Sequence, residues 1–435
     1  MASQATGEAA MATQTAWWRE PTRGQWFTFV AAWVGWVLDA FDFTIFLLVM
    51  PSMAREFHVS VTATAGSITL TLLLRLFGGV AAGAAADRWG RKLPLMISLF
   101  WFAACDGAVA FAPSFAWVLA LRTLFGFGMG AEWTSGATLA MENWPARSRG
   151  IASGVLQGSW AVGYLLAALA FGWVVPHFGW RALFLVAAAP ALLVLPIRIW
   201  VPESEEWKAR KNDASAQISR GQYVAPAQLR GHLRTIVWAS VVMGCGFGAY
   251  YGLTGLYPTL LDGLGHKPAA IAHYVMIFNV GMMGGAIVTG ILAAKKGVAR
   301  AVAVPALASL PFLPLYVGAV PALIGVGAFF GGGLAVGFTG VTPLFLTELF
   351  PPEVRARAVG VVYHVGALFA AFVPSAMAFL VQRAHVALPR AILMVAVACE
   401  LGLVGLFSFS GSRRPSAQLA GSASRSEPAA SASAS

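Results

Sequence analysis

Charged side chains are scarce in this sequence. Asp, Glu, Lys and Arg together make up 11% of the 435 residues, whereas a soluble domain carries roughly 25%. Hydrophobic residues make up 58%, and the mean hydropathy is +0.72. This balance excludes an ordinary soluble fold and predicts a chain that lies mostly within a lipid bilayer. The net charge of +11 does not indicate nucleic-acid binding, because the basic residues fall in short segments between apolar runs.

Cysteine is equally rare, and patterns typical of enzymes are missing. Cys105, Cys245 and Cys399 each fall inside an apolar run, so we expect neither a disulfide framework nor a metal site. The chain has no motif for a nucleotide, a metal or a catalytic nucleophile, which predicts a protein that is not an enzyme and uses no cofactor. The first 16 residues are small and polar and lack the apolar core of a cleavable signal peptide, so we expect the first span to act as the membrane signal.

The chain has instead a series of apolar runs that are long enough to cross a bilayer. A transmembrane helix needs about 20 apolar residues. Twelve runs meet this length, near residues 26–51, 62–86, 93–112, 115–140, 150–174, 180–200, 235–261, 269–294, 300–319, 321–348, 357–382 and 389–410. The fold class predicted is an all-α membrane protein with 12 transmembrane helices.

These runs divide the chain into five parts. We expect a cytoplasmic N-terminal segment at 1–25, a six-helix bundle at 26–201, a central cytoplasmic loop at 202–234, a second six-helix bundle at 235–410 and a disordered tail at 411–435. Most of the 29 lysines and arginines fall on one set of alternating loops. By the positive-inside rule, this asymmetry places both termini in the cytoplasm.

Two motifs occur twice, at nearly the same spacing. The segment 83–92 reads Gly-Ala-Ala-Ala-Asp-Arg-Trp-Gly-Arg-Lys and is matched by Gly-Ile-Leu-Ala-Ala-Lys-Lys-Gly at 290–297, about 207 residues later. The segment 142–150 is matched by 348–357, at an offset of about 206 residues. Two repeats in one register indicate an internal duplication, as in transporters built from two similar halves.

Charged residues inside the predicted spans are the first candidates for function, because each costs about 2.5–3.5 kcal/mol to insert at the bilayer centre. They are Asp39, Asp42, Arg75, Asp106, Arg122 and Glu132. At 1.5 Å per residue, Asp39 and Arg75 lie at a similar height, roughly 20 Å above the cytoplasmic end, and Arg122 lies near the height of Asp42. Matched depth therefore predicts the pairs Asp39–Arg75 and Asp42–Arg122, with helix rotation left open.

The acidic residues allow two interpretations. Asp39 and Asp42 share one helix face, and a carboxylate in a midplane cavity beside a like charge is suited to binding a proton. Glu132 is a further candidate for proton coupling. The alternative is a static ion-pair network that holds the helices together, and Asp106 fits this structural role better than a functional one.

Candidate substrate-binding residues come from both halves. Arg75 and Arg122 would bind a carboxylate or serve as counter-charges, because the planar guanidinium pairs with carboxylates through two parallel hydrogen bonds. The second half is almost free of charge within its spans and offers neutral hydrogen bonds and aromatic walls. Its candidates are Tyr251, Asn279, Tyr363 and His364, with Tyr250 beside them. His364 would either titrate near neutral pH or serve as a packing residue.

The Asp-x-x-Asp pattern at 39–42 resembles the signature of proton-coupled organic-acid symporters. The chain most resembles the sialate:proton symporter family of the major facilitator superfamily, and next the aromatic acid:proton symporters. The segment 83–92 resembles the loop signature of the superfamily as a whole, and the segments that agree with the sialate-type pattern include 75–79, 128–133, 142–145, 179–184 and 202–208. The resemblance is dense in the first half and thinner in the second, where His364 stands at a position at which asparagine is expected. It implies two pseudo-symmetric bundles and proton-coupled uptake of an organic anion, such as a sialic acid, by alternating access in a bacterial inner membrane.

The same resemblance implies a cytoplasmic latch between the two bundles. The residues expected to form it are Gly83, Asp87, Arg88, Gly90, Arg91, Glu142, Arg147 and Arg149. In the second copy of the first motif, Ala294 replaces the aspartate, so the latch is predicted to be asymmetric. The expected partners are a small organic anion, a proton and the lipid bilayer, and we expect a monomer.

Other functions stay open at this point. The substrate class includes aromatic acids and short monocarboxylates such as lactate and pyruvate. An antiporter or exporter is disfavoured, because the run 150–174 lacks the Gly-Pro signature of that class. A membrane sensor that does not transport is disfavoured by the short polar tail without an appended domain.

Overall fold

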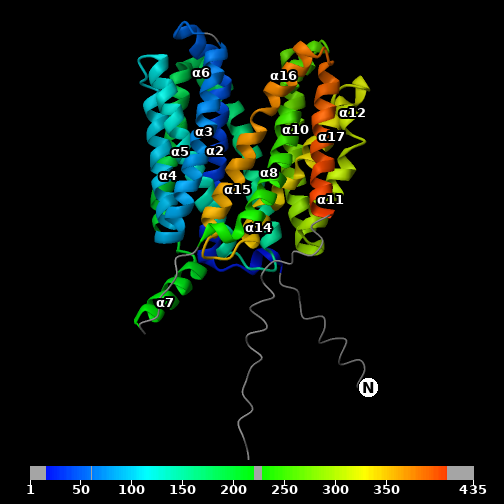
Figure 1. The fold of residues 1–435 in the computed structure, drawn as a ribbon. Helices are drawn as coiled ribbons and strands as arrows, with labels where there is room; N and C mark the ends of the chain where they lie inside the picture. Colours follow the sequence, from blue (N-terminus) through cyan, green and yellow to red (C-terminus); the bar gives the residue numbers. More distant parts are fainter. Residues whose placement is uncertain (1–15, 60, 220–227, 409–435) are drawn as a thin grey trace, which may run out of the picture.

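The computed structural model describes residues 16–59, 61–219 and 228–408, and within them every regular element is helical (Figure 1). The predicted N-terminal segment up to residue 15 and the predicted tail 411–435 lie outside the described residues. A short 3₁₀ turn, η2 (Trp17–Arg19), precedes the first long helix.

The first half of the chain contains five long helices. They are α2 (Arg23–Glu56), α3 (Val61–Trp89), α4 (Lys92–Val109), α5 (Phe115–Asn143) and α6 (Arg149–Ile199). α2 begins at a capping box, in which the Thr22 hydroxyl and the Gln25 side chain each accept a hydrogen bond from the other residue's backbone N–H. α6 covers two predicted spans. They are separated at Gly179, whose φ of 77° is a conformation that favours glycine.

The second half is more broken. Its helices are α8 (Leu233–Thr254), α9 (Tyr257–Gly263), α10 (Pro268–Lys296), α11 (Val298–Ser309), α12 (Leu313–Tyr316), α13 (Ile324–Phe330), α14 (Thr342–Leu349), α15 (Arg355–Ala370), α16 (Val373–Arg383) and α17 (Leu388–Ser408). The predicted span 321–348 is not one regular helix, because a π turn (η5, Gly331–Ala335) and a 3₁₀ turn (η6, Gly337–Val341) separate α13 from α14. This irregular backbone is buried against α10, where bilayer lipid does not reach it.

Within the described residues, nine helical stretches are long and apolar enough to cross a membrane. The number is smaller than the twelve predicted runs partly because residues 149–189 count as one stretch and α11 is too short to be included. The helical content and the apolar stretches agree with a membrane protein that crosses the bilayer many times.

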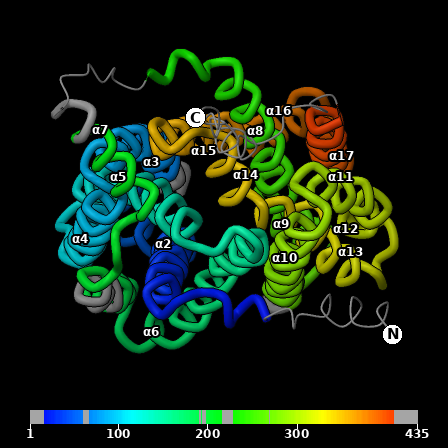
Figure 2. The backbone as a smooth tube through the Cα atoms, turned by 90° about the horizontal axis from the view of Figure 1, so that it is seen from below, coloured from blue at the N-terminus to red at the C-terminus, as the bar shows by residue number. Residues whose placement is uncertain are grey.

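The two halves of the chain form two bundles that lie side by side (Figure 2). Their most extensive contacts are equivalent in the two halves, of α3 with α15 and of α6 with α10. A Cβ added at Gly83 would lie 2.6 Å from the Ala356 carbonyl oxygen, and one added at Gly154 would lie 2.4 Å from that of Ala286. Glycine at these positions therefore lets the backbones of the two bundles touch.

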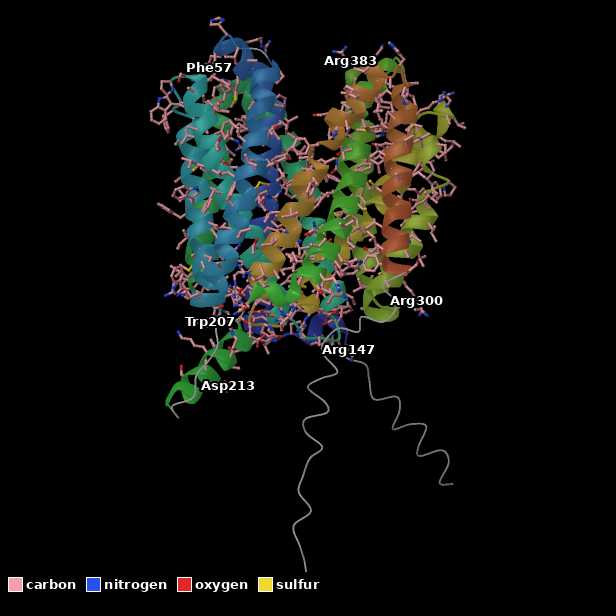
Figure 3. The ribbon with its side chains drawn as sticks, viewed as in Figure 1. Phe57, Arg147, Trp207, Asp213, Arg300 and Arg383 are labelled. Atoms are coloured by element: carbon pink, nitrogen blue, oxygen red, sulfur yellow. The ribbon has the colours of Figure 1, made fainter. Side chains whose placement is uncertain are left out.

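The predicted latch residues lie at one end of the molecule. Figure 3 places Arg147, Trp207 and Arg300 at one end, whereas Phe57 and Arg383 lie at the other. The first of these ends also carries α7 (Glu205–Ser219), a helix that lies within the predicted central loop. We call it the latch end, because the predicted latch residues gather there.

Candidate functional site

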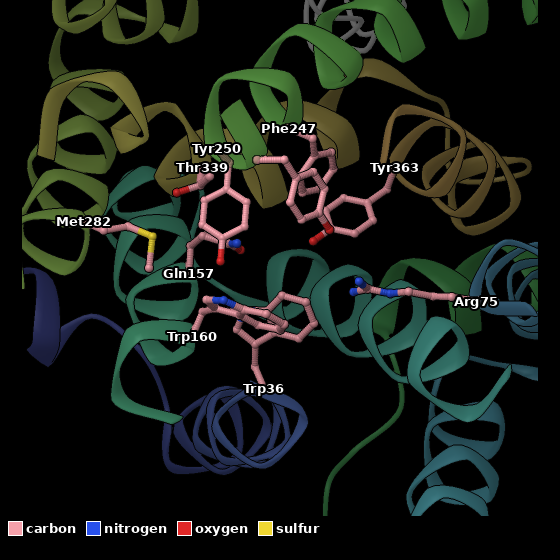
Figure 4. Close-up of a pocket in the computed structure, with 10 residues that line it drawn as sticks. Trp36, Arg75, Gln157, Trp160, Phe247, Tyr250, Met282, Thr339 and Tyr363 are labelled. Atoms are coloured by element: carbon pink, nitrogen blue, oxygen red, sulfur yellow. The ribbon is translucent and has the colours of Figure 1, made fainter. Parts of the chain in front are cut away.

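A pocket lies between the two bundles. Its cavity volume is about 40 Å³, and the empty space between its walls is about 430 Å³ when open solvent is included. The first half contributes Trp36, Arg75, Gln157 and Trp160, and the second half contributes Phe247, Tyr250, Tyr251, Met282, Thr339 and Tyr363 (Figure 4). Because both bundles line the pocket, any relative movement of the bundles changes its shape.

Aromatic rings form two facing walls of this pocket. Figure 4 shows Trp36 and Trp160 on one side and Phe247, Tyr250 and Tyr363 on the other. The Trp36 and Trp160 rings are 4.9 Å apart, and the Phe247 and Tyr363 rings pack edge to face at the same distance. A slot of this kind suits a ligand with a flat, apolar body.

Arg75 is the charged residue among those that line the pocket. Its side chain is buried, and its guanidinium carbon lies 5.9 Å from the centre of the Trp36 ring and 5.6 Å from that of Tyr363. Its Nε and Nη2 atoms have no hydrogen-bond partner among the described residues. Buried donors on a cation without an acceptor are costly, so the site is suited to an anion.

The structure separates the predicted binding residues into two groups. Arg75, Tyr251 and Tyr363 line the pocket. Arg122 and Asn279 are buried elsewhere, and the Asn279 amide donates to the Val275 carbonyl of its own helix. His364, the remaining member of the second group, is buried beside the pocket residue Tyr363 but does not line the pocket.

The pocket floor is closed by contacts between α5 and α15. Trp133 and Tyr363 stack with ring centres 3.5 Å apart. Beside them, the His364 Nε2 atom lies 3.2 Å from both the Thr134 hydroxyl and the Gly130 carbonyl oxygen. These contacts join the bundles between the pocket and the latch end.

The buried acids have partners that depth alone did not predict. Arg122 pairs with Asp106 at 2.8 Å, rather than with Asp42, because α4 and α5 turn these side chains toward each other. Asp42 interacts electrostatically with both residues, and its carboxyl group lies within hydrogen-bonding reach of the Asp106 carboxyl group. Asp39 has no hydrogen-bond partner among the described residues and lies beyond salt-bridge distance of Arg75, although the two charges attract.

Sequence reasoning missed two buried charges. Arg198 pairs with Glu132 at 3.2 Å and donates to the Ala31 carbonyl. It lies two residues from the end of the predicted span 180–200, where a basic side chain normally reaches the interface. Glu400 of α17 is 1% exposed, and its oxygens have no partner among the described residues. It was visible as the single acid of the run 389–410, so the second half is not free of buried charge.

The latch end contains a network that joins the bundles. Arg91 binds Glu142 through two hydrogen bonds of 3.1 and 3.0 Å, and Arg355 binds the same carboxylate at 3.0 Å. The Asp87 carboxylate accepts from the backbone N–H groups of Ala356 and Arg357, at the first turn of α15. A carboxylate is favourable at a helix N-terminus because the unpaired N–H groups and the helix dipole both attract it.

Other predicted latch residues lie around this network. Gly90 has a φ of 102°, and any Cβ there would collide with Glu203. Arg88 is exposed and lies over the Trp89 ring, while Arg147 pairs with Glu20 at 3.0 Å. The guanidinium of Arg149 binds the Trp144 carbonyl and attracts Glu348, the counterpart of Glu142 in the second half.

Part of α7 and the residues before it join the network, which the sequence did not reveal. Glu203 accepts from the backbone N–H groups of Arg91 and Lys92, and Glu206 binds Arg355. Trp207 and Arg210 both donate to the Asp87 carbonyl, at 3.1 and 2.7 Å. The signal available in the sequence was the cluster of acids at 203–206 directly after the last span of the first half.

Comparison with known proteins places the chain in a family. The Major Facilitator Superfamily model matches residues 32–374. The chain belongs to the Major Facilitator Superfamily. It is 30% identical over 357 residues to the sialic acid transporter NanX of Escherichia coli (strain K12), covering 81% of this chain and 86% of that protein. It is 31% identical over 368 residues to a cis,cis-muconate transport protein of Acinetobacter baylyi, with coverages of 83% and 88%.

The fold agrees with solved structures of the superfamily. The structure of the proton:xylose symporter XylE bound to 6-bromo-6-deoxy-D-glucose aligns with a TM-score of 0.68 at 18% identity, covering 88% of this chain and 95% of that one. The predicted fold class and the predicted resemblance are therefore confirmed. The protein is a multi-pass membrane transporter and not an enzyme. Within the described residues, no group of three or more His, Cys, Asp or Glu side chains is placed to hold a metal ion.

Proposed function

We propose that this transporter couples the entry of protons to the uptake of a small organic carboxylate. The observation that carries the proposal is Arg75, a buried cation in the pocket between the bundles with two nitrogen atoms that lack a hydrogen-bond partner in the described part of the chain. A substrate carboxylate would accept from these nitrogens through two parallel hydrogen bonds. The relatives named for sialic acid and for cis,cis-muconate support an acidic substrate.

The first bundle contains buried carboxyl groups that could bind the coupled proton. Away from the latch end, the charged residues buried in the described parts of its membrane helices are four acids and three bases, namely Asp39, Asp42, Asp106, Glu132, Arg75, Arg122 and Arg198. Arg122 and Arg198 are occupied by Asp106 and Glu132. Among the described residues, Arg75 is the cation that attracts Asp39 most strongly, whereas Asp42 lies beside the paired Asp106 and Arg122. Binding of the substrate carboxylate to Arg75 would weaken the attraction between Arg75 and Asp39. A proton on one of them would then offset the added negative charge.

Transport would proceed by alternating access. The bundles are held together at the latch end by the network around Asp87 and Glu142 and by the stack of Trp133 on Tyr363. Release of the substrate at this end would require both sets of contacts to break. Binding can drive such a change only if the substrate and proton favour one state over the other.

We propose that the protein lies in a bacterial inner membrane with both termini in the cytoplasm, and that it acts as a monomer. Arg91, Arg355 and Arg357 lie in the network at the latch end, and these basic residues support a cytoplasmic position for that end. The bacterial relatives support the bacterial inner membrane.

Uptake into proteoliposomes with an imposed pH gradient tests this function. The panel consists of labelled sialic acid, lactate, pyruvate, 4-hydroxybenzoate and a neutral sugar. We expect an inward proton gradient to drive accumulation of at least one acid, whereas the sugar is not accumulated. Arg75→Gln should lower that uptake at least tenfold, because charge-assisted hydrogen bonds contribute about 1.5–3 kcal/mol each.

Arg300→Gln is the matched control, since Arg300 is exposed at the latch end, away from the pocket. It should transport like the wild type. Uptake that does not respond to the gradient, or that is unchanged by Arg75→Gln, would contradict the proposal.

A further inference from the structure

The two ends of the pocket are related by the internal duplication. The offset of about 207 residues that relates Gly83 to Gly290 also relates Arg75 to Met282, and both of these residues line the pocket. The offset of about 206 residues in the following helices relates Gln157 to Tyr363, which also line it. The helix contacts follow the same symmetry, because α3 meets α15 and α10 meets α6.

These four residues lie at opposite ends of the aromatic slot. Figure 4 shows Arg75 and Tyr363 toward one side of the pocket and Met282 and Gln157 toward the other. One end therefore presents a guanidinium and a phenol, and the equivalent end presents a thioether and an amide. The helices are arranged nearly symmetrically around the pocket, but the side chains at the equivalent positions differ. The pocket therefore favours one orientation of its ligand over the reverse.

The end opposite Arg75 has an unused hydrogen-bonding group. The Gln157 side chain is buried, and its Oε1 atom has no hydrogen-bond partner among the described residues. The residues around it, including Met282 and Thr339, are neutral. A hydroxyl group of a ligand would satisfy this acceptor, whereas a carboxylate would be buried there without a cation.

We propose that Gln157 selects the substrate by the group opposite its carboxylate, favouring a hydroxyl over hydrogen and over a second carboxylate. The inference rests on the proposed function, because Arg75 must bind the first carboxylate. In this proposal, the rings of Tyr363, Trp36 and Trp160 pack against the body of the substrate. Arg75 binds the carboxylate at one end, and Gln157 accepts a hydrogen bond from the hydroxyl group at the other end. The substrate class is a flat monocarboxylate with a hydroxyl group at its far end.

Three probes that differ only at the far end test this selection. They are benzoate, 4-hydroxybenzoate and terephthalate, whose groups opposite the carboxylate are hydrogen, hydroxyl and carboxylate. In proteoliposomes with an inward proton gradient, the wild type should take up 4-hydroxybenzoate with an apparent affinity roughly tenfold higher than that for either other acid. Gln157→Leu should remove the advantage of 4-hydroxybenzoate over benzoate.

A second variant uses the duplication directly. Met282→Lys places a cation at the position equivalent to Arg75, so the affinity for terephthalate should rise at least tenfold. Gln382→Leu is the matched control, because Gln382 is an exposed amide at the end of α16, away from the pocket. It should keep the order of the three acids found for the wild type.

The outcomes separate this inference from the proposed function. Uptake of the three acids without preference, or an equal loss for all three in Gln157→Leu, overturns the selection by Gln157 and leaves carboxylate uptake intact. Transport of sialic acid but of none of the three probes also overturns it. A protein that transports no acid at all overturns the proposed function.

Discussion

Arg357 in the second half donates two hydrogen bonds to Asp87 in the first half, one from its backbone N–H at 3.1 Å and one from its guanidinium Nε at 3.0 Å. In the internal duplication, the residue equivalent to Asp87 is Ala294, whose backbone packs against Gly150. One of the two symmetry-related contacts between the bundles is therefore charged, whereas the other consists of small residues in close contact.

This difference predicts unequal effects of mutation at the two positions. Asp87→Asn should slow uptake at least tenfold, because it weakens hydrogen bonds that each contribute about 1.5–3 kcal/mol when one partner is charged. Ala294→Asp should lose less than threefold, since the second contact does not depend on charge. Initial rates of gradient-driven uptake measure both variants. Equal losses in the two would contradict an asymmetric latch.

Much of the fold could be predicted from the sequence, because the apolar runs and the duplicated motifs are both one-dimensional signals. The latch residues Asp87, Arg91 and Glu142 could be predicted from the motif in which they stand. Arg355 and Arg357 stand in the second copy of the duplicated motif, but the sequence does not show that they pair with Glu142 and Asp87 in the other bundle. The sequence likewise gives the depth of Arg122 in the membrane but not the rotation of its helix.

The pocket was predictable only in part. Arg75 was identifiable because a charge in an apolar run is unusual. Trp36 and Gln157 lie among many similar apolar and polar residues, and only the packed bundles show that they share a cavity with Tyr363. The irregular turns between α13 and α14 could not be predicted from the sequence, because this segment is as apolar as a regular transmembrane helix.

The close approach of the bundles predicts that size matters at Gly83. Gly83→Val should open the latch end, because the new side chain meets the Ala356 carbonyl and the Arg357 backbone. Uptake should fall at least tenfold, and a cysteine introduced at position 356 should react faster with a water-soluble maleimide than in the parent protein. Gly172→Val, at a position where a Cβ meets no atom within 4 Å, should leave both readouts unchanged. Unaltered labelling in Gly83→Val would refute a closed latch end.

The buried pair of Glu132 and Arg198 predicts a coupled effect on stability. Arg198→Met leaves the Glu132 carboxylate buried without its cation, and breaking such a pair costs about 3–5 kcal/mol. The melting temperature in detergent should fall clearly. The double variant Glu132→Gln with Arg198→Met should recover most of the loss, because no unpaired charge remains. A double variant that is as unstable as Arg198→Met would show that the pair does not act as a unit.

The central claim is that a carboxylate enters together with a proton that Asp42 accepts. The direct measurement is acidification of the lumen of proteoliposomes that contain a trapped pH-sensitive dye, after addition of the acid with the highest uptake in the panel. The account predicts acidification that follows acid entry in the wild type. In Asp42→Asn, acidification should be absent while exchange of labelled for unlabelled acid persists. Acidification at the wild-type rate in Asp42→Asn would contradict the account.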